Sequence, residues 1–251
     1  MPRKHYVQNV RSISIVIPAF NEAARLPATI SKVLRYCGER PYQFEVIVCD
    51  DGSTDGTAAA IKAFLNDHRV RLLRTKTNQG KGAAARRGIL AAKNSYILLF
   101  DADMSTPIEE IEKLLPLASE NIVLIGSRAQ QTSRLVRRQA FFRERMGKIF
   151  NFIIRIALGF SLRDTQCGFK LFPLGLAQEV FQDLLVRRFA FDVEVLLKVL
   201  KKNIECREIA VQWMNSTPSR VHPIHDSVQM LIDVIRIHHR YGKLPWTEKN
   251  M

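Results

Sequence analysis

Residues 44–57 read FEVIVCDDGSTDGT, and this stretch decides the fold class. An apolar, β-branched run ends in two aspartates, and a glycine-rich turn then leads into a helical pattern at 57–67. The run predicts a buried strand, and Gly52 and Gly56 permit the tight turn after it. Asp50, directly after the strand, is placed to accept hydrogen bonds from a nucleobase or ribose, although an ordinary strand–helix turn would explain it too.

The same strand–helix unit recurs along the chain. Apolar runs predict strands at 12–18, 44–50, 70–74, 96–101 and 122–127, with helical patterns between them at 21–37, 57–67, 81–93 and 107–119. The second half is more helical, with patterns at 138–157, 174–186 and 190–202, a strand at 204–213 and a long final helix at 225–240. This alternation predicts an α/β fold: a mostly parallel central sheet flanked by helices, in one domain spanning residues 1–251.

Composition agrees with a folded protein. The chain has 251 residues, of which 47% are hydrophobic and 25% charged, and these ordinary values exclude global disorder. The four cysteines show neither CxxC nor Cys/His spacing, which argues against a zinc site and favours a reducing compartment: Cys37, Cys49, Cys167 and Cys206.

The charge favours anionic partners. The formal net charge is +14, and residues 128–155 alone hold seven Arg and one Lys against the single acid Glu144. Phe and Ile are interleaved with these cations, as in basic amphipathic helices that lie on anionic membranes. A core-packed helix with a solvated basic face is the alternative. The stretch 226–246 is a second amphipathic candidate. No nucleic-acid recognition module is present, so nucleic acid is not expected as a partner.

No segment predicts a membrane span. The longest apolar segment, 149–160, is interrupted by Asn151 and Arg155, whereas a span needs about 20 apolar residues. The N-terminal residues lack the apolar core of a signal peptide. We therefore expect a cytoplasmic protein that rests peripherally on the cytoplasmic face of a membrane.

The sequence YILLFDADMSTP (96–107) ends an expected strand in two carboxylates, Asp101 and Asp103. Side chains two apart on a strand share a face, and two like charges that close repel unless a cation lies between them. The pair therefore predicts a divalent cation. Because ligands of parallel sheets bind at the carboxyl ends of strands, this is also the expected place for the active site.

Two other motif readings are weaker. DADMST (101–106) matches the DxDxT pattern of phosphatases that form an aspartyl-phosphate, but those enzymes carry it on the first strand, and here three strands precede it. NQGKGAAARRG (78–88) lacks the GxxxxGK[ST] order of a P-loop. It predicts a glycine turn at a helix N-terminus, with Lys81 and Arg86 near an anion.

Seven blocks in order resemble the family 2 inverting glycosyltransferases with the GT-A fold, and among them the polyprenyl- or dolichyl-phosphate glycosyltransferases of the dolichyl-phosphate glucosyltransferase type. The blocks are IVIPAFNEAARL, VIVCDDGSTDGT, NQGKGAAARRG, DADMSTP, IGSR, DTQCGFKLF and RFAFDVEVL, and the resemblance runs from about residue 12 to 240. It implies a nucleotide-sugar-binding half at about 12–130 and an acceptor-binding half at about 131–240. Many eukaryotic relatives have an N-terminal membrane helix, which this sequence lacks.

The resemblance also implies roles for individual residues. Asp101 and Asp103 would bind Mg²⁺ or Mn²⁺ on the donor diphosphate, and Arg128 would bind phosphate. Acids of the last two blocks would lie near the transferred sugar, with Asp164, Asp192 and Arg128 as catalytic candidates and Glu194 nearby. The nucleotide and substrate contacts would come from Pro18, Phe20, Glu22, Asp50, Asp51, Lys81, Ala102, Gln166, Gly168 and Lys170.

Chemistry limits what such a site must do. A hard cation on carboxylates offsets the charge that builds on a leaving diphosphate. A lipid phosphate, with a second pKa of about 6, is already ionised at neutral pH and needs no strong base, unlike a sugar hydroxyl. We therefore expect a hexosyltransferase that moves glucose from UDP-glucose to a polyprenyl or dolichyl phosphate, with Asp164 or Asp192 orienting the sugar.

Three alternatives remain open at this point. The same fold could transfer a sugar to a soluble or glycan hydroxyl, or mannose from GDP-mannose to a polyprenyl phosphate. From another class, the chain could be a basic membrane- or nucleic-acid-binding module with a degenerate site.

Overall fold

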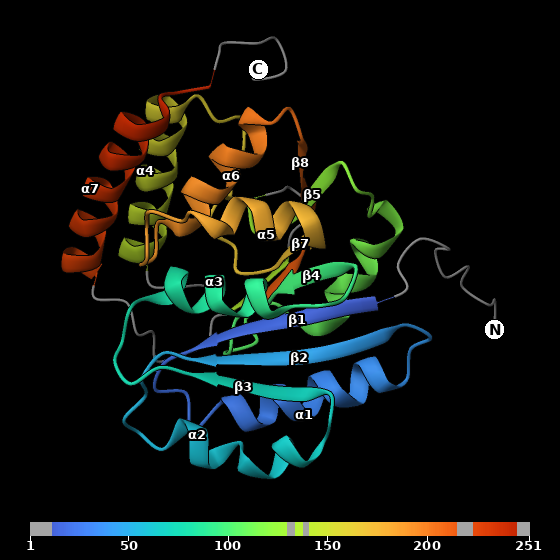
Figure 1. The fold of residues 1–251 in the computed structure, drawn as a ribbon. Coiled ribbons are helices and arrows are strands. Elements are labelled where there is room, and N and C mark those ends of the chain that lie inside the picture. Colours follow the sequence, from blue (N-terminus) through green and yellow to red (C-terminus); the bar gives the residue numbers. More distant parts are fainter. Residues whose placement is uncertain (1–11, 130–133, 138–140, 215–222, 245–251) are drawn as a thin grey trace.

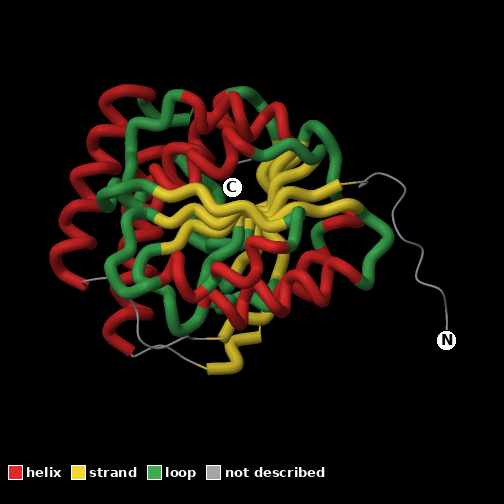
Figure 2. The backbone as a smooth tube through the Cα atoms, turned by 60° about the horizontal axis from the view of Figure 1, so that its bottom comes forward, coloured by secondary structure: helices red, strands yellow, loops and turns green. Residues whose placement is uncertain are grey.

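The computed structural model describes residues 12–129, 134–137, 141–214 and 223–244, and centres on a seven-stranded sheet with helices on both faces (Figures 1 and 2). The strand order is β3-β2-β1-β4-β7-β5-β8. Its strands are β1 (Ser12–Ala19), β2 (Gln43–Asp50), β3 (Val70–Arg74), β4 (Tyr96–Leu99), β5 (Ile122–Ser127), β7 (Lys170–Pro173) and β8 (Glu205–Ala210). Only β7 runs antiparallel to its sheet neighbours, so the predicted mostly parallel α/β fold is confirmed.

Strand residues alternate between two cores, one on each face of the sheet. On β1, for example, Val16 belongs to one core and its neighbours Ile15 and Ile17 to the other, all fully buried. Burial on both faces explains why these strands are continuous apolar runs rather than alternating patterns. For the same reason, these strands could be predicted from the sequence.

The helices cover the sheet in two layers. Residues of α1 (Leu26–Gly38) join the core on one face, and those of α3 (Lys81–Ala91), α5 (Leu174–Gln182) and α6 (Phe191–Lys201) join the core on the other (Figure 1). The pair α4 (Phe141–Leu158) and α7 (Pro223–Tyr241) packs together at one edge of the molecule. The predicted C-terminal helices are confirmed in backbone, while the side chains of 134–149 and 223–226 lie outside the described part.

Several element predictions need correction. The expected helix at 57–67 is a short α2 (Thr57–Ala60) followed by the 3-10 helix η1 (Lys62–Asn66). The expected helix at 107–119 is a pair of 3-10 turns, η2 (Ile108–Lys113) and η3 (Leu115–Leu117), because Pro116 cannot donate an interior helical hydrogen bond. The first helix begins at Leu26 rather than residue 21, with a proline in its first turn.

The two short strands β6 (Arg134–Arg137) and β7 were not predicted, and the strand expected at 204–213 was predicted longer than any strand found there. The expected strand at 204–213 is split into β8 and β9 (Gln212–Met214), and β9 pairs with β6 in a separate two-stranded sheet. The strands β6 and β7 have four residues each, too few for a periodic signal. None of the helices in the described ranges is long and apolar enough to cross a membrane.

Candidate active site

Two loops at the carboxyl ends of β1 and β2 are joined by reciprocal hydrogen bonds. The backbone N–H of Asn21 donates to Ser53 Oγ at 2.8 Å, and the Thr54 N–H donates to Asn21 Oδ1 at 2.9 Å. Asn21 has a positive φ of 56°, which asparagine tolerates better than most residues. Ala23 N–H also donates to Asp55 at 3.1 Å. This clasp places the expected nucleotide residues of both loops beside one another.

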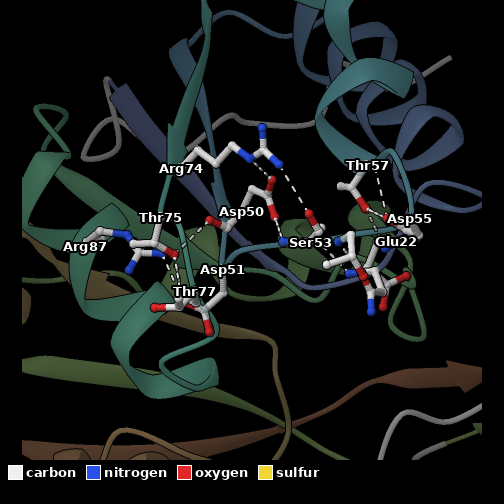
Figure 3. Close-up of polar contacts among 12 residues, drawn as sticks. Glu22, Asp50, Asp51, Ser53, Asp55, Thr57, Arg74, Thr75, Thr77 and Arg87 are labelled. Carbon is white, nitrogen blue, oxygen red and sulfur yellow. Dashed lines mark hydrogen bonds and ion pairs between the residues drawn. The ribbon is translucent and has the colours of Figure 1, made fainter.

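Asp50 is fully buried beneath this clasp. Its Oδ1 accepts the Ser53 N–H at 2.9 Å, and Arg74 Nε lies 3.0 Å from Oδ2 (Figure 3). The geometry between Arg74 and Oδ2 is that of an ion pair and not of a hydrogen bond, and Oδ2 accepts no hydrogen bond from any described residue. A buried oxygen without a directed donor can still accept one from a ligand. Arg74 was not singled out from the sequence; the structure pairs it with Asp50 at the ends of β3 and β2.

Asp51 faces the protein rather than the clasp. Its Oδ2 accepts the backbone N–H groups of Gln79 at 2.9 Å and Gly80 at 2.7 Å, while Oδ1 pairs with Arg87 at 3.3 Å (Figure 3). These bonds hold the turn that starts α3. Asp51 therefore positions the turn before α3, and its expected substrate contact stays a prediction.

The remaining residues of the first block lie around Asp50. Pro18 is buried in β1 and Phe20 is half-buried just after it. Glu22 is 8% exposed, its N–H donates to Thr57 Oγ1 at 2.9 Å, and its carboxylate accepts from Arg25 Nε at 2.6 Å. The block thus lies beside the strand end that carries Asp50, since Ala19 pairs with Asp50 in the sheet.

Asp101 and Asp103 do not lie on a strand, because β4 ends at Leu99. The expectation that strand alternation puts both on one face is therefore wrong. They lie in the turn that follows, in which Met104 has a φ of 52° and the Ser105 N–H donates to Asp103 Oδ1 at 2.9 Å. Between them, Ala102 is buried and its carbonyl accepts from Thr29 Oγ1 at 2.7 Å, which anchors the turn to α1.

Basic side chains surround this turn. Lys81 Nζ lies 2.7 Å from Asp101 Oδ1, and an Arg25 nitrogen lies 4.0 Å from Asp103 Oδ2. Desolvation raises the pKa of Asp101, but Lys81, Lys170 and Arg128 outweigh it and hold that pKa below its usual value. Desolvation likewise lowers the pKa of Lys81, yet Asp101 and Asp192 hold it above the usual value. Both groups are charged at neutral pH.

Gly168 lies directly against the Asp101 carboxylate. A Cβ at this position would be 2.0 Å from Asp101 Oδ2, so only glycine fits while Asp101 keeps its place. The DTQCGFK block is thereby brought to the DxD turn, although more than sixty residues separate them in sequence.

Arg128 is held in a two-pronged ion pair. Its Nε and Nη2 each lie 2.7 Å from an oxygen of Asp164, and its backbone N–H donates to the same carboxylate at 2.9 Å. Its guanidinium carbon lies 5.6 Å from the centre of the Trp213 ring. Desolvation raises the pKa of Asp164, but Arg128 outweighs it and holds that pKa below the usual value. Asp164 therefore orients Arg128, and Trp213, which the sequence did not single out, supports it.

Lys170 and Asp192 form a second pair, deep in the protein. Lys170 is fully buried, and its Nζ lies 2.6 Å from Asp192 Oδ1. Burial raises the pKa of Asp192 above its usual value, against the opposing effect of Lys170. Glu194, two residues further on α6, turns elsewhere: it accepts the N–H groups of Leu185 and Val186 and the Tyr241 hydroxyl. Its carboxylate stabilises a loop and α7, and its expected place near the sugar stays a prediction. Gln166 is half-buried.

A divalent cation would suit the DxD turn. Carboxylate oxygens are the ligands that Mg²⁺ prefers, and it is often bound by one or two carboxylates together with substrate phosphates. No group of three or more metal-ligating side chains occurs in the described ranges. Asp101 and Asp103 supply two carboxylates on one turn, and the donor diphosphate would complete the set.

The sequence comparisons agree with this geometry. Residues 14–181 match the family model "Glycosyl transferase family 2". The chain belongs to this family. A dolichyl-phosphate beta-glucosyltransferase of Dictyostelium discoideum is 34% identical over 98% of the chain and 80% of the relative, and that of Homo sapiens is 34% identical over 94% and 78%. The expected glycosyltransferase identity of this hexosyltransferase-type enzyme is therefore confirmed.

Solved structures confirm the GT-A fold. Glucosyl-3-phosphoglycerate synthase from Mycobacterium tuberculosis, solved in complex with Mn²⁺ and UDP-glucose, covers 94% of the chain with a TM-score of 0.65 at 18% identity. Mannosyl-3-phosphoglycerate synthase from Rubrobacter xylanophilus covers 95% with a TM-score of 0.63 at 15% identity. At these identities the likeness concerns the fold alone.

Proposed function

We propose that this glycosyltransferase moves glucose from UDP-glucose to a dolichyl or related polyprenyl phosphate, with the aid of Mg²⁺ or Mn²⁺. One observation carries the proposal: Lys81 Nζ lies 2.7 Å from Asp101 Oδ1 on the DxD turn, and Lys170 and Arg128 also help to hold the pKa of this carboxyl below its usual value. A diphosphate donor and a phosphate acceptor both need such an excess of positive charge. The choice of glucose and of a dolichyl phosphate follows the name of the relatives, dolichyl-phosphate beta-glucosyltransferase.

The nucleotide end of the donor would lie in the clasp between the β1 and β2 loops. Asp50 Oδ2 is buried and accepts no hydrogen bond from the part of the chain that the structure describes, and it would accept one from the base or ribose. Pro18, Phe20 and Glu22 would form the wall beside it. We place this donor half at about residues 12–130 and the acceptor half at about 131–240.

The diphosphate would lie over the DxD turn. Asp101 and Asp103 would hold the divalent cation, which when bound stabilises the negative charge on the leaving UDP. Lys81, now paired with Asp101, would turn to a phosphate oxygen once the cation neutralises that carboxylate. Its position at the N-terminus of α3 adds the partial positive charge of the helix end.

The acceptor phosphate would approach from the side of Arg128. Asp164 fixes the guanidinium through two parallel hydrogen bonds, so the arginine is oriented before the acceptor arrives. The acceptor is already ionised, and its oxygen can attack the sugar without a general base. Asp192, with its raised pKa, would accept or donate a hydrogen bond at the sugar, steadied by Lys170.

The lipid acceptor also sets the place of action. We propose that the protein works as a peripheral protein on the cytoplasmic face of a membrane, because a polyprenyl tail keeps the acceptor in the bilayer.

A donor and metal panel tests the reaction. UDP-glucose, UDP-galactose, GDP-mannose and GDP-glucose would each be mixed with a short polyprenyl phosphate and Mg²⁺ or Mn²⁺, and nucleotide release measured. We expect UDP release from UDP-glucose to exceed release from the other donors by at least about tenfold, and to stop when EDTA is added. Equal release from GDP-mannose, or full activity in EDTA, would contradict the proposal.

A further inference from the structure

Two neighbouring helices expose most of the large apolar side chains on the described surface. Of eleven such exposed residues, six lie on α4 and α7. We call these six the α4/α7 strip: Phe152 (60% exposed), Ile156 (66%), Val228 (55%), Leu231 (39%), Ile232 (39%) and Ile235 (56%). Scattered single apolar residues are normal on a protein surface, but a gathering of this kind marks an interaction site.

The apolar residues of the strip on α7 form a second face, separate from the face of this helix that packs on the core. On α7, Val234 and Ile237 are buried in the core, and Met230 packs against it. The exposed residues 228, 231, 232 and 235 follow the i, i+3, i+4, i+7 spacing of a second helical face. The helix α7 is therefore apolar on two sides, and only one of them is explained by the fold.

The two helices run side by side in the same direction. His238 Nδ1 lies 2.9 Å from the Ala157 carbonyl, and the Leu244 N–H donates to the Leu158 carbonyl at 2.9 Å. Figure 1 shows α7 and α4 adjacent at one edge of the molecule, away from the sheet. Phe152 and Ile156 thus lie at the same height along the pair as Leu231 and Ile235.

The charge around the strip is positive. Arg155, Arg236, Arg240 and Lys243 are exposed on or just after these helices. Over the described side chains 150–158 and 227–244 there is one carboxylate, Asp233, which is 5% exposed and paired with Arg236 at 3.2 Å. A second copy of this chain would therefore bring like charges together, whereas an anionic lipid surface would be attracted.

From these observations we propose that the α4/α7 strip is the surface that docks on an anionic phospholipid membrane. The inference deepens the proposed function and rests on it for the membrane. The apolar side chains would enter the boundary between headgroups and acyl chains, and the arginines would pair with lipid phosphates.

Both helices are tied to the acceptor side of the active site. Thr165 Oγ1 donates to Asn151 Oδ1 at 3.1 Å, which links α4 to the segment that carries Asp164. The Tyr241 hydroxyl donates to Glu194 at 2.9 Å, which links α7 to the helix that carries Asp192. Docking through the strip would therefore hold the acceptor half near the bilayer in which a lipid phosphate resides.

Vesicle flotation tests the surface. The double variant Leu231→Gln/Ile232→Gln removes two exposed apolar side chains of the strip, and Leu65→Gln/Leu117→Gln removes two of similar exposure on other elements. With phosphatidylcholine vesicles containing phosphatidylserine, we expect the strip variant to bind at least about tenfold more weakly than the wild type and the control to bind like it. Vesicles without phosphatidylserine should bind the wild type less.

A second measurement separates this inference from the proposed function. Glucose transfer to a short, water-soluble polyprenyl phosphate, measured without vesicles, should be equal in the strip variant and the wild type. Unchanged vesicle binding by the strip variant would overturn the docking surface and leave the function intact. Loss of vesicle binding in a protein that transfers no glucose at all would support the surface and refute the function. A wild-type dimer in light scattering that the strip variant abolishes, with vesicle binding unchanged, would assign the strip to a second copy and overturn the proposal.

Discussion

At the scale of single residues, the contact between Gly168 and Asp101 is the most demanding in the site. A methyl group at 168 would overlap the carboxylate, whereas the helical Gly175 has open space around its Cβ position. We expect Gly168→Ala to displace Asp101, to lower the free energy of unfolding by about 1–3 kcal/mol and to weaken Mn²⁺ binding. Gly175→Ala should cause neither loss.

Urea unfolding and Mn²⁺ titration followed by electron paramagnetic resonance would measure the two effects of Gly168→Ala. If Gly168→Ala and Gly175→Ala bind Mn²⁺ equally well in the presence of UDP, then Asp101 does not hold the cation.

A substitution of Asp103 tests the catalytic role of the DxD turn without disturbing the fold. Its side chain is partly exposed, so replacing it with Asn should leave the fold intact. We expect Asp103→Asn to lower kcat by on the order of 10²-fold, because one ligand of the charge-stabilising cation is lost. Glu109→Gln, a more exposed acid on η2, is the matched control and should keep full activity. Wild-type turnover by Asp103→Asn would remove the metal from the proposed mechanism.

The Arg128–Asp164 pair predicts a pH dependence of stability. The pKa of Asp164 is lower in the folded protein than the unfolded value of about 3.9, so the carboxylate stabilises the fold above that value. The stability that it adds should be fully present at neutral pH and be lost as pH falls below about 4 toward the folded pKa. Urea unfolding of wild type and Asp164→Asn from pH 7 to pH 3 would show a difference that shrinks only at the acidic end. A difference that grows in acid would contradict the assignment.

Sequence reasoning reached most site residues but not their partners. Acids after apolar runs indicated Asp50 and Asp101, because the carboxyl ends of parallel strands converge, whereas Gly168 came only from the family resemblance. The contact between Gly168 and Asp101 could not be foreseen, since β7 has only four residues and its antiparallel course brings position 168 to the DxD turn. Asp192 and Glu194 have different partners because residues two apart on a helix face different ways.

At the scale of elements, Glu194 joins a loop and two helices. Its carboxylate accepts two backbone N–H groups from the 185–186 loop and the hydroxyl of Tyr241 on α7. We expect Glu194→Gln to cost about 1–3 kcal/mol of unfolding free energy, because buried donors lose a charged acceptor. Tyr241→Phe, which removes one of these bonds, should cost about 0.5–1.5 kcal/mol. A Glu194→Gln loss no greater than that of Tyr241→Phe would show that the loop does not depend on this carboxylate.

Long buried strands and long helices were predictable, and short or irregular elements were not. Burial on both faces makes β1, β2 and β5 continuous apolar runs. By contrast, η2 and η3 carry a helical apolar pattern that is not realised as an α-helix, because Pro116 and the packing of Ile108 and Ile111 on the sheet favour 3-10 turns. Hydrophobic periodicity alone does not distinguish an α-helix from successive 3-10 turns.

At the scale of the whole molecule, the sheet gathers residues that are far apart in the chain. Its order β3-β2-β1-β4-β7-β5-β8 puts the DxD turn after β4 next to the DTQCGFK block before β7 and the IGSR block at the end of β5. The proposed donor half and acceptor half therefore share one continuous sheet, and Lys81 from the first and Lys170 from the second both lower the pKa of Asp101.

The most direct test of the central claim compares two acceptors that differ only in their head group. The protein would be incubated with radiolabelled UDP-glucose, Mn²⁺ and either a short polyprenyl phosphate or the matching polyprenol. We predict that label enters the organic-soluble fraction with the phosphate and stays at background with the alcohol, because a phosphate is already ionised at neutral pH whereas an alcohol must lose a proton. Label transferred to the alcohol at a comparable rate, or to neither lipid, would contradict the account.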